Sequence, residues 1–78
     1  MKIILTFNDE KELKTIKEIF DENNRSYELI NKTMKLDITG FDYKKTNMFG
    51  FETIELIMGN HALEVRLKFI TDIIIGGK

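Results

Sequence analysis

The sequence lacks most of the side chains on which small enzymes and metal proteins depend. It contains no cysteine, so disulfides and thiolate metal ligands are both excluded. Its one histidine, His61, has Glu64 nearby, but this pair supplies two ligands where a zinc site needs three or four. We therefore interpret His61 as a polar turn residue rather than as a metal ligand or a lone general base.

Glycine motifs that bind phosphate are also missing. Gly50, Gly59 and the pair at 76–77 are isolated, and none of them joins a strand to a helix. A glycosidase-like carboxylate pair needs a cleft between its members, and a domain with a single helix leaves little room for one. We predict that the protein is not an enzyme and that it holds no metal and no other cofactor.

Neither sign of charge dominates, and long apolar runs are absent. The net charge of −1 argues against a strongly basic nucleic-acid surface and equally against an acidic nucleic-acid mimic. No apolar stretch approaches the roughly 20 residues that span a bilayer, and the start of the chain lacks the long apolar segment of a signal peptide. The 78 residues predict one cytoplasmic domain, residues 1–78, with no membrane association.

Residue usage carries information about the genome rather than the fold. Isoleucine, lysine and asparagine are abundant, whereas alanine occurs once, at Ala62. The three abundant residues have AT-rich codons, which indicates a low-GC bacterium, or a phage or mobile element of one.

The clearest structural signal is a hairpin that turns at Gly59-Asn60. Two alternating apolar segments, 51–58 and 61–69, meet at this pair, and glycine accepts the positive φ that a two-residue turn requires. The register predicts one apolar face and one mixed face. The predicted pairs are Ile54 with Val65 and Leu56 with Leu63 on the first face, and Thr53 with Arg66 and Phe51 with Lys68 on the second.

The same register brings two carboxylates together. Glu55 falls opposite Glu64, and like charges at that position repel. We expect Arg66, one diagonal step away, to offset the repulsion. The three side chains form a solvated face or an exposed contact patch.

The first part of the chain predicts a strand followed by a helix. Residues 2–7 alternate as a strand does. Asp9 and Glu12 then form a capping-box pattern, and apolar residues follow at helical spacing to about residue 23. Asn23-Asn24 is suited to end the helix in a left-handed conformation. Lysines 11, 14 and 17 lie on its opposite side.

A second hairpin is predicted over residues 26–39, with its turn at Asn31-Lys32. This register joins apolar residues to apolar ones and opposite charges to each other. The predicted pairs are Leu29 with Met34, Tyr27 with Leu36, and Glu28 with Lys35.

The remainder of the chain completes an α+β domain. Residues 40–50 show no clear period and predict a loop with one helical turn at 42–48, while 73–75 form a short apolar tail or a final strand after a bend at Thr71-Asp72. We expect one amphipathic helix on one mostly antiparallel sheet of about five strands. The order is β-α-β-β-(loop)-β-β, with the two strands around the helix parallel.

Two features indicate a binding role. The segment 40–51 combines aromatic rings with Lys44 and Lys45, a composition that can stack bases and neutralise phosphates. In addition, a single helix cannot cover about five strands, so several isoleucines form a partly apolar surface that suits a protein partner or a second copy of the chain. These isoleucines are Ile4, Ile30, Ile57, Ile70 and Ile73–Ile75, together with Phe51.

The leading hypothesis is a non-enzymatic protein-binding module. We expect a small inhibitor or regulator of a host protein, of the kind that phages and mobile elements encode, acting through an exposed sheet face or edge. Its expected partner is a host protein or a second copy of the chain, which would make it a homodimer. A single-stranded nucleic-acid binder and a structural or assembly subunit are the alternatives. The candidate binding residues are Phe41, Tyr43, Lys44, Lys45, Phe49, Phe51, Ile57, Arg66, Ile73, Ile74 and Ile75.

Overall fold

The computed structural model describes residues 1–46 and 48–76. Asn47, inside the expected helical turn at 42–48, and residues 77–78, after the expected apolar tail at 73–75, lie outside the described part. In chain order the elements are β1 (Lys2–Phe7), α1 (Glu10–Glu22), β2 (Glu28–Ile30), β3 (Thr33–Asp37), β4 (Gly40–Lys44), β5 (Thr53–Met58), β6 (His61–Arg66), the 3₁₀ helix η1 (Leu67–Phe69) and β7 (Ile70–Gly76).

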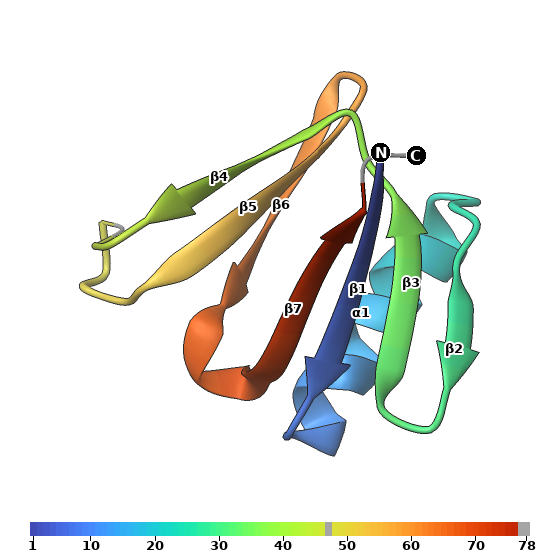
Figure 1. Cartoon of the computed structure of the whole chain (residues 1–78), viewed down its shortest axis with the longest axis horizontal. Helices are drawn as coiled ribbons and strands as arrows, with labels where there is room; N and C mark the ends of the chain where they lie inside the picture. Colours follow the sequence, from blue (N-terminus) through green and yellow to red (C-terminus); the bar gives the residue numbers. More distant parts are fainter. Residues whose placement is uncertain (47, 77–78) are drawn as a thin grey trace.

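The strands form two antiparallel sheets rather than the single sheet of about five strands that the sequence suggests (Figure 1). Sheet A has the order β2-β3-β1-β7, and sheet B has the order β4-β5-β6. The α+β class with one helix is confirmed for the described residues. β1 and β2 run in the same direction, as predicted, with β3 between them and antiparallel to both.

A second sheet shares with the single helix the task of covering the core. The helix α1 lies across one face of sheet A, behind β1 and β3 in Figure 1. Side chains from the helix and from both sheets then join one buried cluster. It includes Ile3, Leu5 and Phe7 of β1, Leu13, Ile16 and Phe20 of α1, Met34 and Leu36 of β3, and Ile54, Leu56, Met58 and Val65 of sheet B. None of the surplus apolar residues expected from the sequence belongs to this cluster, although Ile70 and Ile73 are partly buried against it.

The chain passes from one sheet to the other at two consecutive residues. The amide of Ile38 donates to the carbonyl of Met1 at 2.8 Å, next to β1 in sheet A. The amide of Thr39 donates to the carbonyl of Ile57 at 2.7 Å, in sheet B. Ile38 itself is buried in the core cluster. The continuous run from β3 to β4 therefore ties both sheets together, and switching strands of this kind are typical of two-sheet packings.

The helix forms where its caps predict. The backbone amide of Glu12 donates to Asp9 Oδ1 at 2.9 Å, which satisfies one of the free donors at the helix N-terminus. At the other end Asn24 has φ of 54°, the left-handed conformation that the sequence suggested for the Asn23-Asn24 pair. Of the residues at helical spacing, Leu13, Ile16 and Phe20 are buried.

The β5–β6 hairpin confirms the predicted register. Ile54 pairs with Val65, Leu56 with Leu63 and Thr53 with Arg66. Gly59 has φ of 67° and begins the two-residue turn. The predicted pair of Phe51 with Lys68 is wrong, because the ladder ends at Arg66 and residues 67–69 turn into η1.

The β2–β3 hairpin also has its predicted turn, and Asn31 adopts φ of 55° there. Leu29 pairs with Met34 and Glu28 with Lys35, as expected. The expected pair of Tyr27 with Leu36 is wrong, because β2 begins at Glu28. The ring of Tyr27 instead lies 6.0 Å from that of Phe20, measured between centroids.

The strand β4 is the main element that the sequence prediction missed. Residues 40–44 form a strand against β5, not a loop with a helical turn. Phe41 and Tyr43 alternate with Asp42 and Lys44, but four alternating residues after a glycine gave too short a signal. The final strand β7 pairs with β1 over most of its length, and a register shift near Thr71 takes the place of the expected bend. No described helix has both the length and the apolar character needed to cross a membrane.

Thr53 presents a buried polar group without a hydrogen bond. Its side chain is 1% exposed, and its hydroxyl has no hydrogen-bond partner in the described structure. Such a group loses its hydration on folding without compensation. We expect Thr53→Val to stabilise the fold by about 0.5–1 kcal/mol, measured by urea unfolding followed by circular dichroism.

Thr39→Val is the matched control, because the Thr39 hydroxyl has two partners. It donates to the carbonyl of Ile57 at 3.0 Å and accepts from the amide of Gly59 at 3.0 Å. The same replacement should therefore destabilise the fold by about 1 kcal/mol there. A Thr53→Val protein less stable than the wild type would contradict the described environment of Thr53.

Candidate functional site

The outer edge of sheet B exposes a group of apolar side chains. β4 is an edge strand, because its one partner in sheet B is β5 (Figure 1). Phe41 and Tyr43 pair with Leu56 and Ile54, so their side chains lie on the core-facing side of the sheet. Both project past the core at its border and stay 41% and 53% exposed. Aromatic rings at a free strand edge are typical of interaction surfaces.

The segment after β4 adds apolar side chains on the other side of the strand. Met48 and Phe49 are 89% and 73% exposed. They line a surface hollow of about 380 Å³ together with Lys44, Thr46 and Glu64, whose β6 position belongs to the outer face of the sheet. The edge of β4 is therefore flanked by apolar groups on both sides. We call β4 with residues 45–50, apart from the undescribed Asn47, the β4 edge.

A hydrogen bond fixes one of these rings. The hydroxyl of Tyr43 donates to Glu52 Oε2, across the connection between β4 and β5. This bond to a carboxylate raises the pKa of Tyr43 above its usual value. Glu52 was not a candidate residue, because its role depends on the strand β4 that the sequence prediction lacked.

Lys44 lies between the two facing carboxylates of the hairpin. Glu55 and Glu64 pair directly across β5 and β6, as the register predicted. Lys44 Nζ lies 3.4 Å from Glu55 Oε2 and 3.1 Å from Glu64 Oε1, and these two groups raise the pKa of the lysine. The cation that offsets the repulsion is thus Lys44 of β4, not Arg66 as expected.

Arg66 instead covers an aromatic ring. Its Cζ lies 4.0 Å from the ring centroid of Phe51, and Lys68 Nζ lies 5.9 Å from the same centroid. Both distances are within the range of cation–π attraction. Phe51 is half-buried in this stack, so it belongs to the packing around the β5–β6 hairpin rather than to the exposed β4 edge.

The candidate isoleucines do not form one surface. Ile57 is half-buried on the outer face of sheet B, between Gly40 and Ala62. Ile74 pairs with Ile4 on the face of sheet A away from the helix, and is 52% exposed. Ile73 and Ile75 flank Ile74 on β7 and pair with core residues of β1, so their side chains lie on the core-facing side of sheet A. Ile73 is half-buried there, and Ile75 is 42% exposed.

The predicted binding residues therefore divide into separate regions. Phe41, Tyr43, Lys44, Lys45 and Phe49 come together at the β4 edge, whereas Phe51 with Arg66, Ile57, and Ile73–Ile75 lie elsewhere. Sequence reasoning missed Met48 as a member of the β4 edge.

The described residues offer no suitable set of metal ligands. His61 is exposed, and by the alternation of β6 its side chain lies on the opposite face of the strand from Glu64. No three His, Asp or Glu side chains come together there in a way that could hold a metal ion. The idea of a shared His61–Glu64 ligand pair therefore has no support.

Comparison with known proteins returns no relative. No family model, no curated protein and no solved structure matches this chain. The function has to be inferred from the geometry described above.

The ion pairs of Lys44 give a testable prediction. In Lys44→Met, Glu55 and Glu64 face each other without a cation, so the thermal midpoint should fall at low salt. Lys45→Met is the matched control, because Lys45 is exposed and makes no ion pair in the described structure. The gap between the two variants should shrink in about 1 M salt, where the screening length is ~3 Å. Equal midpoints at low salt would contradict the described ion pairs.

The same pair of proteins predicts a pH dependence. The folded pKa of Lys44 lies above its ordinary value of 10.5. The stabilisation by its ion pairs is thus complete below that ordinary value and is lost as the pH rises through the raised folded value. Thermal unfolding at a series of alkaline pH values should show wild type and Lys44→Met converging there. A gap that stays constant through this range would oppose the assignment.

Proposed function

We propose that the protein is a non-enzymatic binding module that accepts an extended segment of another protein along the β4 edge. One observation carries the proposal: a free edge strand is flanked on both sides by exposed apolar side chains, Phe41 and Tyr43 on one side and Met48 and Phe49 on the other. Aromatic residues and methionine are enriched at protein interfaces.

Strand addition suits the chemistry of this edge. An added strand gains backbone hydrogen bonds from the free edge, while alternate side chains contact the rings that flank it. The edge has few of the devices that usually block such pairing. The chain contains no proline, and Lys44 is directed towards Glu55 and Glu64 on the sheet face instead of guarding the edge.

The expected partner is a segment with alternating apolar side chains from a host protein. In this proposal the protein is a cytoplasmic inhibitor or regulator encoded by a phage or mobile element of a low-GC bacterium. The codon preference behind its isoleucine, lysine and asparagine content supports that origin. A second copy of the chain is the competing occupant of the same edge, and it predicts a dimer by light scattering.

Single-stranded nucleic acid is the alternative ligand of the same edge. The exposed rings of Phe41 and Tyr43 and the exposed Lys45 favour it. The ion pairs of Lys44 weigh against it, because one of the two expected phosphate-binding cations is already neutralised. A fluorescence titration with mixed oligonucleotides at low salt tests this alternative, since electrostatic binding is strongest there.

Photo-crosslinking tests the protein-binding proposal. A benzophenone amino acid replaces Lys45 at the β4 edge, and in a control protein it replaces Lys11 on the exposed side of α1. After irradiation in a lysate of a low-GC bacterium, the probe at position 45 should yield a distinct crosslinked protein that the probe at position 11 does not. The products are identified by mass spectrometry.

Charge substitutions then locate the contact. Phe41→Lys, made in the position-45 probe protein, places a charge at the edge and should abolish the crosslink. Ile74→Lys places the same charge at an exposed position on the far face of sheet A and should leave the crosslink intact. Loss of the crosslink with Ile74→Lys but not with Phe41→Lys would move the contact to sheet A and overturn the proposal.

A further inference from the structure

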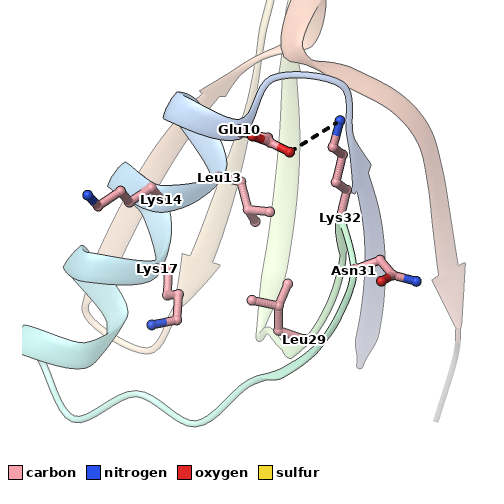
Figure 2. A pocket seen from close by; sticks show the side chains of 7 residues that line it. All are labelled: Glu10, Leu13, Lys14, Lys17, Leu29, Asn31 and Lys32. Carbon is pink, nitrogen blue, oxygen red and sulfur yellow. Dashed lines mark ion pairs between the residues drawn. The ribbon is translucent and has the colours of Figure 1, made fainter.

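A groove lies between the helix α1 and the turn of the β2–β3 hairpin, away from the β4 edge (Figure 2). Its volume is about 390 Å³, within the range of small-molecule pockets, which begins at roughly 300 Å³. Leu13 of the helix and Leu29 of β2 extend into it from opposite sides. They give the groove an apolar floor that belongs to the edge of the core.

Charged side chains surround this floor. Lys14 and Lys17 come from the helix, Lys32 comes from the hairpin turn, and Glu10 is the one carboxylate in the lining. Three cations against one anion make the groove locally positive, in a chain whose net charge is −1. The charge of the groove thus opposes that of the protein as a whole.

The three lysines differ in their availability. Lys17 Nζ lies 3.4 Å from Asp21 Oδ2, which is one helical turn away. Lys32 Nζ lies 3.9 Å from Glu10 Oε1, a loose ion pair across the top of the groove. Lys14 makes no ion pair in the described structure. In Figure 2, however, the side chain of Lys14 extends away from Leu13 and Leu29, so Lys32, which has the longer of the two ion pairs, is the cation best placed to contact a ligand.

We propose that this groove binds a small molecule with an aliphatic chain that ends in a carboxylate. The chain covers Leu13 and Leu29, and the carboxylate is held at the rim by Lys32. An apolar body with a few polar anchors is the usual composition of a ligand pocket. All residues that line the groove belong to the described part of the chain, and none of them has an aromatic ring on which a nucleobase could stack.

The inference does not depend on the proposed protein-binding role. The groove is formed by α1 and the β2–β3 hairpin, and none of its lining residues belongs to β4 or to residues 45–50. A failure of the β4-edge experiments leaves this site untouched, and the reverse is also true.

Octanoate is the probe for the test, with octylamine as its cationic counterpart of the same chain. Methyl resonances of Leu13 and Leu29 are followed by NMR while each compound is added below its micelle concentration. Octanoate should shift both leucines saturably, with a dissociation constant of about 1 mM or tighter for a ligand of this size. Octylamine should bind at least about threefold more weakly, because its charge is repelled by the lysines.

Charge variants of the groove supply the matched comparison. Lys32→Gln should weaken octanoate binding by about threefold, whereas Lys11→Gln, on the helix α1 outside the groove, should leave it unchanged. Glu10→Gln should strengthen binding by about twofold, since it removes the rim carboxylate and frees Lys32. Circular dichroism confirms that each variant is folded.

Three results would overturn the inference. They are the absence of leucine shifts at an octanoate concentration 10-fold above the expected dissociation constant, equal affinity for octanoate and octylamine, and equal weakening by Lys11→Gln and Lys32→Gln. The first result would show that octanoate does not bind in the groove. The other two would show that it binds non-specifically, through apolar surface or through net charge.

Discussion

The architecture depends on the passage of the chain from β3 of sheet A to β4 of sheet B. At Ile38 and Thr39, neighbouring backbone amides donate to different sheets, one to Met1 and the next to Ile57. Backbone donors in a buried position need partners, so this arrangement fixes where sheet B begins and how it lies on the core. Ile38 fills the corner with a buried side chain.

The candidate binding edge is a consequence of this passage. β4 continues directly from the switch, and among the described strands of sheet B it has β5 on one side and none on the other. Its rings follow the alternation of a strand whose core-facing side runs past the border of the core. The same continuation brings Lys44 to the facing carboxylates Glu55 and Glu64. One topological feature thus accounts for the exposed rings and for the neutralised lysine.

Local chemistry made the hairpins and the helix predictable. Gly59 and Asn31 adopt positive φ where the turns require it, and once each turn is placed, the side-chain alternation fixes the register. Asp9 caps the helix for an equally local reason, a hydrogen bond to a backbone amide three residues away. These features depend on residues close together in the sequence.

The arrangement of the sheets was not predictable in this way. Alternation shows that one face of a strand is buried, but not which element buries it, so the second sheet was missed. β4 was missed because its short alternation, Phe41 to Lys44, stands between a glycine and a polar segment. The errors in the candidate site followed from these two omissions. Arg66 was assigned to the carboxylates because Lys44 was placed in a loop, and the isoleucines were treated as one surface because a single sheet was assumed.

Residue-resolved amide hydrogen exchange of the isolated protein tests this account most directly. If the passage from β3 to β4 ties the two sheets together and leaves β4 with a free edge, the amides of Ile38 and Thr39 both exchange slowly. Along β4, the amides directed towards β5 are then slow, and those directed outwards exchange at nearly the rate of an unfolded peptide. Rapid exchange at Thr39, or slow exchange at every amide of β4 in the monomer, would contradict it.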